Sequence, residues 1–303
     1  MEDCLKAQGL TKQYHRCLAL DNLSLHIPQG AIYGLVGKNG SGKTTLIRLI
    51  CGLQQPTSGE YSLYGVSCKD PAIAKCRKRM GAVVETPSIY RNMTARDNLK
   101  QQYRILGIPS FEGIDELLEL VGLADTGKKK VSHFSLGMRQ RLGIAIALAG
   151  DPDFLVLDEP ANGLDPQGII EIRELILNLN RRRQVTVLIS SHILDELSRL
   201  ATHYGFLDKG RLLKEISAAE LEAACQKSIR IQVSDLRALV LTAHRLGLDC
   251  QVLDETTAQI SAQVSVTDLV QALAKEGCQV LSLTNQEESL ESYYMNLVGE
   301  EQP

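Results

Sequence analysis

The chain begins with short apolar runs that are separated by polar turns. Residues 3 to 10 and 22 to 27 have the composition of strands, and the second run alternates apolar with polar positions. Ile32 to Val36 is apolar throughout, as expected of a strand that is buried on both faces of a parallel sheet. Thr45 to Ile50 predicts a helix, and Glu60 to Tyr64 predicts a further short strand.

Helical spacing of apolar residues dominates from Ser88 to Gly150. Thr94 is expected to cap one of the helices there, because its side chain can accept a hydrogen bond from a free backbone N–H group. We therefore expect a largely helical subdomain inserted into an α/β core. Beyond it, residues 154 to 157 and 184 to 190 predict two buried strands, with a helix over residues 169 to 179 between them.

Strands alternate with helices through residue 215, which predicts a mainly parallel sheet with crossover connections. The order of patterns after that point is β-α-β-β-α-β-α, with alternation over residues 258 to 264 marking one strand. This order is typical of a small ferredoxin-like module, although a looser α+β packing would also satisfy it. We expect two domains, residues 1–215 and 216–303, with the helical subdomain at about residues 88–150.

Composition places the chain among ordinary globular proteins. Of its 303 residues, 44% are hydrophobic and 23% are charged, so disorder is not expected. The net charge of -3 gives no overall electrostatic case for nucleic acid or an anionic membrane as a partner. The acidic N-terminus lacks the apolar core of a signal peptide. No run approaches the roughly 18 apolar residues of a spanning helix, so work at a membrane would require another chain to supply the span.

The eight cysteines are scattered, without the close pairs that structural metal sites require. We expect them to be reduced thiols in the cytosol. They are Cys4, Cys17, Cys51, Cys68, Cys76, Cys225, Cys250 and Cys278.

The chain has three basic runs, of which residues 75–79 and 128–130 are expected to be solvated and residues 181–183 form the third. The third ends a predicted helix, where positive charges complement the negative end of the helix dipole. A nucleic-acid patch is the second choice for this third run.

Gly37 to Thr44 fits the phosphate-binding P-loop pattern G-x-x-x-x-G-K-[ST] at every fixed position. Its glycines let the backbone fold round a phosphate chain, so that amide N–H groups and the positive end of the next helix face the anion. Lys43 is expected to reach the β- and γ-phosphates, and Thr44 to hold Mg²⁺. Taken alone, the stretch could be a glycine-rich turn before an ordinary helix. The residues expected to contact the nucleotide here are Gly37, Asn39, Gly40, Ser41, Gly42, Lys43, Thr44 and Thr45.

Asp158 and Glu159 end a buried strand, and the carboxyl ends of parallel strands are where α/β sheets bind their ligands. One of these carboxylates could orient Mg²⁺ while its neighbour activates water. His192 follows the next buried strand, and its place beside the two carboxylates argues for contact with the nucleotide.

For three further residues, a local structural role is the alternative to a role at the nucleotide site. Ser135 and Gly137 precede a helix, and read locally they are an N-cap and a tight turn. Tyr14 lies between the first two strands and alone would be a core or surface aromatic. With a nucleotide site downstream, stacking on adenine becomes the better interpretation of Tyr14.

Five motifs in one order over about residues 1 to 215 resemble the ATP-binding domain of ABC transporters. They are Gly37–Thr44, Phe134–Arg141, Phe154–Glu159, Gly163–Asp165 and Ser191–His192. Their combined order and spacing are far more specific than any single motif. The resemblance implies a P-loop NTPase fold, hydrolysis of ATP, and Mg²⁺ as the metal.

The resemblance also implies a role for each residue of the active centre. Lys43 and Thr44 would be the P-loop pair that binds phosphate and metal. Asp158 would be the carboxylate that holds Mg²⁺, and Glu159 the general base that polarises the attacking water. His192 would be the switch residue near the γ-phosphate, and Tyr14 the adenine-stacking aromatic.

The remaining motif residues imply an assembly. Ser135 and Gly137 belong to the family signature, and Asp165 to the loop that communicates between partners. In this family the signature of one subunit caps the nucleotide held by the P-loop of another, and this chain has one copy of each motif. We therefore expect a head-to-tail dimer of two ATP-binding subunits, a homodimer, with two ATP molecules at the interface.

Three departures from the family pattern narrow the resemblance. Lys38 stands where the family often has Pro, and the signature reads Phe-Ser-Leu-Gly-Met rather than Leu-Ser-Gly-Gly-Gln. Glu85 occupies a loop position where most members carry Gln. The combination resembles the exporter branch associated with bacitracin and lantibiotic resistance. Glu85 is expected to reach Mg²⁺ or its water, with its charge balanced by the metal.

A motor subunit of this branch would drive efflux of an antimicrobial peptide or another amphipathic drug. It would act through a separate integral-membrane permease at the cytoplasmic face of the plasma membrane, by way of the helical subdomain near Glu85 to Tyr103. For the C-terminal domain we expect a role in regulation or dimer support.

The competing hypothesis is a soluble ABC-type ATPase that acts on nucleic acid or ribosomes. That class would favour two ATPase domains in one chain, a long coiled-coil insertion or a stronger basic face. The sequence has none of these features.

Overall fold

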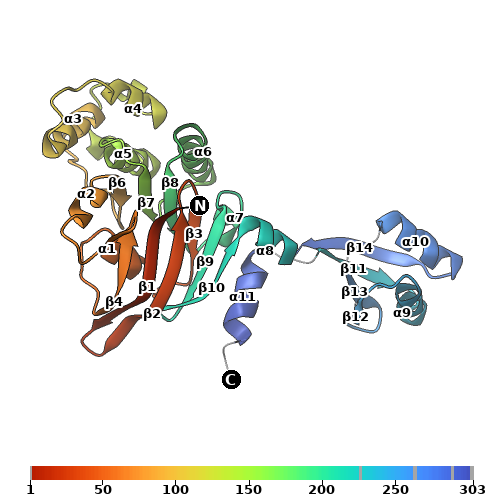
Figure 1. Ribbon diagram of the computed structural model, residues 1–303. Coiled ribbons are helices and arrows are strands. Elements are labelled where there is room, and N and C mark those ends of the chain that lie inside the picture. The colour runs from red at the N-terminus through yellow and green to blue at the C-terminus, as the bar shows by residue number, and fades with distance from the viewer. Residues whose placement is uncertain (1, 225–226, 262–264, 288–289, 301–303) are drawn as a thin grey trace. The chain divides into compact units, whose positions relative to one another are not determined.

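The computed structural model describes residues 2–224, 227–261, 265–287 and 290–300 (Figure 1). It divides into two compact units, Met1–Ala218 and Ala219–Pro303. The sequence pattern places the domain boundary after residue 215, close to this division. Each unit has its own core.

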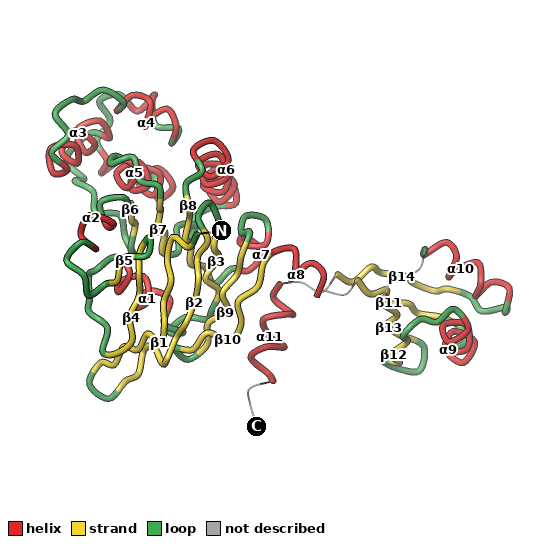
Figure 2. Tube along the Cα trace, viewed as in Figure 1, coloured by secondary structure: helices red, strands yellow, loops and turns green. Residues whose placement is uncertain are grey.

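The first unit is built on a six-stranded sheet in the order β10-β9-β3-β8-β7-β6 (Figure 2). Strands β9 to β6 run parallel and β10 pairs with β9 in the antiparallel sense, which confirms the mainly parallel sheet. Every residue of β3, β7 and β8 is buried, so these strands are apolar over most of their length. The strands are β3 (Ile32–Val36), β6 (Met80–Val83), β7 (Phe154–Asp158), β8 (Thr186–Ser191), β9 (His203–Asp208) and β10 (Arg211–Ser217).

A second sheet of this unit, in the order β2-β1-β4-β5, is antiparallel. The predicted ends of its two long strands, residues 3–10 and 22–27, are wrong. Both strands continue into a more exposed hairpin, in which Tyr14 pairs with Cys17 beside the turn. Backbone pairing therefore extends the strands beyond the apolar residues that predict them. The strands are β1 (Asp3–Tyr14), β2 (Cys17–Pro28), β4 (Ser58–Leu63) and β5 (Val66–Ser67).

Helices α3, α4 and α5 pack against one another and form the helical subdomain between β6 and β7. Thr94 caps α3 as the sequence predicts, because its side chain accepts a hydrogen bond from Asp97 N. Within the described residues, no helix is long and apolar enough to cross a membrane. The helices are α1 (Lys43–Ile50), α2 (Ile73–Arg77), α3 (Ala95–Leu106), α4 (Ile114–Leu120), α5 (Leu136–Leu148), α6 (Pro166–Arg183), α7 (Leu194–Ser198) and α8 (Ala218–Ala224), with 3₁₀ turns at Ala124–Thr126 and Val131–His133.

The second unit contains a four-stranded antiparallel sheet in the order β12-β13-β11-β14. After α8, a helix that the sequence pattern does not predict, its elements follow the predicted order β-α-β-β-α-β-α. Ile229, Ile231 and Val233 alternate along β11 and are buried in its core. Two sequence predictions, the thiol of Cys225 and the alternation over residues 262–264, lie outside the described residues. The elements are β11 (Lys227–Val233), α9 (Leu236–Arg245), β12 (Cys250–Val252), β13 (Thr257–Ser261), α10 (Val266–Lys275), β14 (Val280–Glu287) and α11 (Leu290–Glu300).

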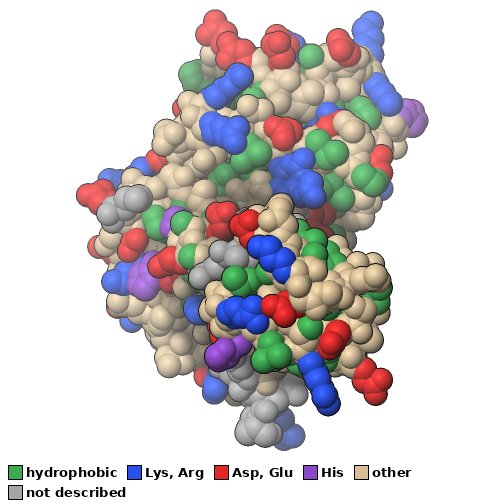
Figure 3. Space-filling model, turned by 90° about the vertical axis from the view of Figure 1, so that its right-hand side faces the viewer, with side chains coloured by type: hydrophobic (Ala, Val, Ile, Leu, Met, Phe, Trp, Pro, Cys, Tyr) green, Lys and Arg blue, Asp and Glu red, His purple; other side chains and the backbone are tan. Residues whose placement is uncertain are grey.

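Acidic and basic side chains are interspersed on the face drawn in Figure 3. The expectation that the basic run at residues 75–79 is solvated is wrong for Arg77, which is half-buried, whereas Arg79 stays exposed although it is hydrogen-bonded. Arg77 donates a hydrogen bond of 2.6 Å to the hydroxyl of Tyr61, and Arg79 Nε donates one of 2.9 Å to Asp153. A guanidinium can bond in this way while its stem covers apolar surface, so these arginines serve packing.

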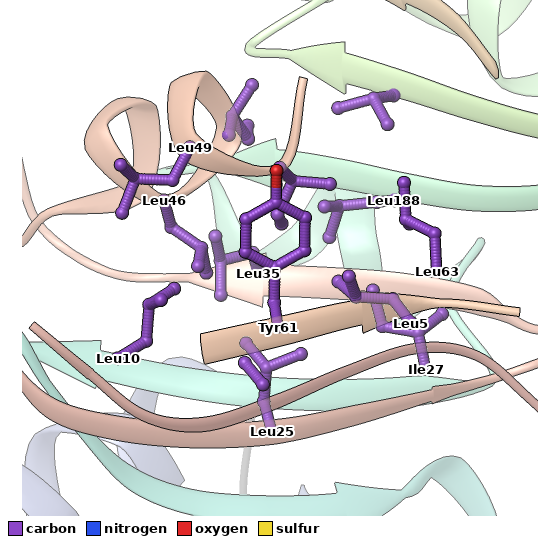
Figure 4. Packing of buried hydrophobic residues seen from close by; sticks show 14 of the residues in the cluster. Leu5, Leu10, Leu25, Ile27, Leu35, Leu46, Leu49, Tyr61, Leu63 and Leu188 are labelled. Carbon is purple, nitrogen blue, oxygen red and sulfur yellow. The ribbon is translucent and has the colours of Figure 1, made fainter. Parts of the chain in front are cut away.

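Helix α1 lies in the main core, between the two sheets of the first unit (Figure 4). Leu46 and Leu49 of this helix share the cluster with Leu35 of β3, Tyr61 of β4 and Leu188 of β8. An eight-residue helix is marginal by itself, so this packing must supply most of its stability. The core therefore also fixes the loop from which α1 starts.

A glycine controls how closely the helical subdomain approaches the sheet. A Cβ atom at Gly81 of β6 would lie 2.2 Å from the carbonyl oxygen of Ala147 in α5. We predict that Gly81→Ala lowers the free energy of unfolding by about 1–3 kcal/mol, because strand and helix must separate. Urea denaturation measures the change. In the control Gly150→Ala the new Cβ meets Leu106 at an ordinary 3.5 Å, and equal midpoints for both variants would contradict the prediction.

Candidate nucleotide-binding site

Three adjacent parallel strands, β3, β8 and β7, end at one edge of the sheet. The loop Gly37–Thr44 follows β3, Asp158 ends β7 with Glu159 next to it, and His192 follows β8. Ligands of open α/β sheets bind at such an edge. The structure therefore brings together the P-loop, the two carboxylates and the histidine that the sequence singles out.

Two glycines give the P-loop its shape. A Cβ atom at Gly37 would lie 2.4 Å from Ser41 Oγ and 2.5 Å from the backbone oxygen of Leu207. Gly42 has a φ of +110°, and its Cβ atom would lie 2.7 Å from the backbone oxygen of Ala19. Since backbone from β2 and β9 closes in on the loop at these points, neither position has room for a larger residue.

The N-terminus of α1 is prepared for an anion. Its first turn has neither a side-chain cap nor an acidic residue, so backbone N–H groups are left for a ligand. The Ser41 hydroxyl is buried and has no hydrogen-bond partner in the described part of the chain. A phosphate group would satisfy these donors. Asn39 and Gly40 are exposed at the tip of the loop, and Thr45 lies in the first turn of α1, half-buried.

Lys43 is a buried cation held by three oxygen atoms. Its side chain is 5% exposed. The ammonium group donates hydrogen bonds of 2.7 Å to Gly37 O and 3.2 Å to Lys38 O, and lies 3.4 Å from Glu159 Oε1. A phosphate that enters the loop would compete with these oxygens for the same charge.

Glu159 occupies the centre of a polar cluster. Its backbone is left-handed, with φ of +47°, and its N–H group donates to Ser190 Oγ at 2.9 Å. The Oε2 atom lies 2.9 Å from His192 Nδ1 and accepts a longer bond of 3.4 Å from the side chain of Asn162. With Lys43 on its other oxygen, the carboxylate is oriented from three sides.

Asp158 is almost fully buried, with 2% of its surface exposed. Ser190 Oγ donates to Asp158 Oδ1 at 2.6 Å, so one hydroxyl orients both neighbouring acidic residues. Ser190 is not among the site residues that the sequence predicts. Its signal was a polar residue at the end of an otherwise apolar strand.

Glu196 is a second residue that the sequence analysis missed. It lies on α7, and its Oε1 atom is buried without a hydrogen-bond partner among the residues that the structure describes. Burial raises the pKa of its carboxyl group, His192 opposes that rise and Glu159 adds to it. Glu196 thus adds a third carboxyl group, after those of Asp158 and Glu159, at the sheet edge close to His192.

The oxygen atoms at this edge fit a magnesium site in which the protein supplies only some of the ligands and the nucleotide and water supply the rest. No group of three or more His, Cys, Asp and Glu side chains among the described residues could hold a metal ion. Mg²⁺ usually takes one or two carboxylates and completes its shell with substrate phosphates and water. Thr44, half-buried at the start of α1, and Asp158 at the end of β7 suit this arrangement. The third expected ligand, Glu85, forms an ion pair with Arg48.

The signature residues form a separate pocket of about 300 Å³, lined by both Ser135 and Asp165. Ser135 caps α5 by accepting from Met138 N, and Asp165 caps α6 by accepting from Gly168 N. The local interpretation of Ser135 as an N-cap is therefore confirmed. These caps place the starts of α5 and α6 at one pocket.

Gly137 lines this pocket, but none of the described residues comes close enough to require a glycine there. A Cβ atom at Gly137 would meet Leu164 at an ordinary 3.8 Å. The small residue leaves space on the open side of the pocket, where the half-exposed side chain of Leu136 also lies. The space suits a group that comes from outside this chain.

Tyr14 lies beside the turn of the β1–β2 hairpin. Its hydroxyl donates to the side chain of Gln54, and the ammonium group of Lys12 lies 5.1 Å from its ring centre. Since Gln54 follows α1, this bond ties the hairpin to the far end of the P-loop helix.

Known proteins are similar to this chain over its whole length. The sequence pattern described as ABC transporter matches residues 20–162. The bacitracin transport ATP-binding protein BcrA of Bacillus licheniformis is 42% identical over 302 residues, which cover 99% of this chain and 98% of BcrA. The lantibiotic transport ATP-binding protein SrtF of Streptococcus pyogenes is 43% identical over 211 residues, or 70% of this chain and 90% of SrtF.

Solved structures agree with the fold of the first unit. One of them is the dimeric, post-hydrolysis state of an ATP-binding cassette bound to ADP and Pi. It aligns with a TM-score of 0.64 at 25% sequence identity, and the alignment covers 71% of this chain and 98% of that one.

Ser190 contacts both acidic residues, through the carboxylate of Asp158 and the backbone N–H group of Glu159. We predict that Ser190→Ala lowers the free energy of unfolding by about 1–3 kcal/mol, because the buried carboxylate of Asp158 loses its donor. Chemical denaturation measures the loss. The neighbouring Ser191→Ala removes only the two local turn bonds between its hydroxyl and the backbone of Ile193 and serves as the control. A smaller loss for Ser190→Ala than for Ser191→Ala would refute the assignment.

Proposed function

The chain belongs to the ATP-binding proteins of ABC transporters, which bind and hydrolyse ATP, and we propose that it is the motor subunit of an antimicrobial-peptide exporter. The observation that carries this proposal is the similarity to BcrA, which extends over both units of the chain. The similarity to SrtF supports the same substrate class. Bacitracin and lantibiotics are thus the peptides to test first.

The P-loop holds the triphosphate of ATP. Backbone N–H groups at the start of α1 and the buried Ser41 hydroxyl donate to phosphate oxygens. Lys43 exchanges the carbonyl oxygens of Gly37 and Lys38 for the phosphates, and so keeps its charge paired throughout. Tyr14 stacks on the adenine after its hydroxyl leaves Gln54.

Glu159 acts as the general base of hydrolysis. When Lys43 turns to the phosphates, one oxygen of Glu159 becomes available to the attacking water. Glu159 accepts the proton as the water oxygen bonds to the γ-phosphorus, and the bond to the β-phosphate oxygen breaks. His192 holds the other carboxylate oxygen and contacts the γ-phosphate, so base and substrate stay aligned.

Mg²⁺ would be held by Thr44, Asp158 and Glu85, where it neutralises charge on the phosphates when bound. Ser190 keeps Asp158 oriented for this purpose. Because Asp158 is buried at the end of a rigid strand, it offers its oxygen with little loss of side-chain freedom.

Two copies of the chain bind head to tail. The pocket at Ser135 and Gly137 of one copy receives the nucleotide that the P-loop of the other copy holds, and Asp165 lies at the same interface. Support comes from the space that Gly137 leaves open. The similar cassette bound to ADP and Pi is itself dimeric.

A separate membrane permease receives the motion at the cytoplasmic face of the plasma membrane. The helical subdomain near Glu85 to Tyr103 contacts it, and exposed apolar side chains such as Tyr90 and Ile105 suit such a contact. On the face drawn in Figure 3 acidic and basic side chains alternate, whereas the rival role, an ATPase that acts on nucleic acid, would favour a continuous basic surface.

Replacing the general base Glu159 should affect ATP hydrolysis but not ATP binding. We predict that Glu159→Gln retains ATP binding but slows hydrolysis by roughly 10²- to 10⁴-fold, the usual contribution of a general base. Equilibrium binding and phosphate release measure the two quantities. Asn162→Ala, which removes only the weaker contact to Glu159, is the control. A Glu159→Gln protein with full ATPase activity would exclude this role.

The transport role is tested with the permease. We predict that the chain co-purifies with a polytopic membrane protein encoded beside it, and that bacitracin or a lantibiotic raises the ATPase rate of the complex. The same complex with Glu159→Gln should show no peptide-stimulated turnover. Retention on nucleic acid at physiological salt, without any membrane partner, would instead favour the rival role.

A further inference from the structure

The loop residue Glu85 creates an electrostatic problem at the proposed ATP site. It follows β6, and β6 lies next to β7, which ends at Asp158. A carboxylate added to those of Asp158 and Glu159 near the phosphates would repel a nucleotide that arrives without metal. A neutral side chain at this position would not, so this chain must balance one additional negative charge.

Arg48 of α1 supplies the opposite charge. Its guanidinium forms an ion pair with Glu85 Oε1. The two side chains are 34% and 57% exposed, and exposed ion pairs are weak. A buried pair would lock Glu85 in place, whereas this pair can be exchanged for another partner.

The position of Arg48 connects this pair to the phosphate site. Arg48 follows Thr44 by four residues, so the two lie on one face of α1, one turn apart. Helical side chains lean toward the N-terminus, which directs Arg48 toward the turn that carries Thr44. The ion pair therefore holds Glu85 at the flank of the P-loop helix.

The backbone supports the same arrangement from the other side. Glu85 has a left-handed φ of +60°, a conformation that is strained for a residue with a side chain. The contact with Arg48 joins this strained turn to a helix that the main core holds in place. Since Arg48 is paired with this strained residue, loss of Arg48 would free both the charge and the turn.

We propose that Arg48 is a positioning residue that neutralises Glu85 and holds it clear of the phosphates until a divalent metal competes for the carboxylate. The proposal rests on the proposed function, because it presumes that ATP occupies the P-loop. Its consequence is specific: Arg48 affects ATP affinity through Glu85, and most strongly when metal is absent.

The test is ATP affinity measured by calorimetry, once in EDTA and once with Mg²⁺. Arg48→Gln is expected to weaken binding in EDTA about two- to fivefold, the range for an exposed ion pair. The loss shrinks in Mg²⁺, because the metal then balances Glu85. Arg48→Lys keeps the charge and stays near the wild-type affinity.

A second set of variants, made in Glu85→Gln protein, distinguishes an effect of Arg48 through Glu85 from a direct attraction between Arg48 and ATP. In Glu85→Gln protein, Arg48→Gln removes only a charge, so it should weaken ATP binding less than it does in the wild type. Arg96→Gln breaks an exposed ion pair with Asp115 in the helical subdomain and is the matched control, with unchanged affinity. An equal loss in both backgrounds overturns the proposal, because Arg48 would then act on the nucleotide directly. A loss as large in Mg²⁺ as in EDTA overturns it too.

Hydrogen exchange of the nucleotide-free protein gives a readout that does not need ATP. The amides of residues 84–86 should exchange faster in Arg48→Gln than in Arg96→Gln, and equal rates would overturn the proposal. A wild-type protein that does not bind ATP would refute the proposed function instead, while the exchange rates would still decide the role of Arg48.

Discussion

The burial of α1 between two sheets is the constraint on which the rest of the site depends. The helix is too short to be stable alone, so apolar contacts from β1, β3, β4 and β8 hold it. Those contacts fix the point where the P-loop enters the helix, and with it the direction of the helix dipole. The second sheet, which contributes no carboxylate to the site, is thus as necessary for anion binding as the strands that end there.

The charged side chains where β3, β7 and β8 end are paired with one another. Lys43, Glu159, His192 and Asn162 satisfy one another, and Ser190 serves Asp158 and the backbone of Glu159. An isolated buried charge would be costly, so pairing stabilises the protein before any ligand binds. Binding then exchanges partners instead of creating new charges. Glu85 and Arg48 form a further ion pair, more exposed to solvent, beside α1.

The features that the sequence predicts correctly are those set by neighbouring residues. The P-loop, the strand into Asp158, the cap at Thr94 and the element order of the second unit all follow from local spacing. The features it misses depend on residues far apart in the chain. Ser190 is selected only when β7 and β8 lie side by side, and Arg77 leaves solvent only because Tyr61 of β4 faces it. Likewise, no local pattern pairs Arg48 with Glu85, 37 residues away.

Glu85 and Glu159 share a left-handed backbone, with φ of +60° and +47°. Such a conformation costs a residue with a side chain on the order of 1–2 kcal/mol, whereas glycine adopts it freely. A search for stabilising substitutions would therefore tend to select glycine or asparagine at these two positions, and would remove both carboxylates. The chain retains glutamate at two positions where the backbone is unfavourable for it, so ranking substitutions by thermal stability alone would here select against two residues of the proposed active centre.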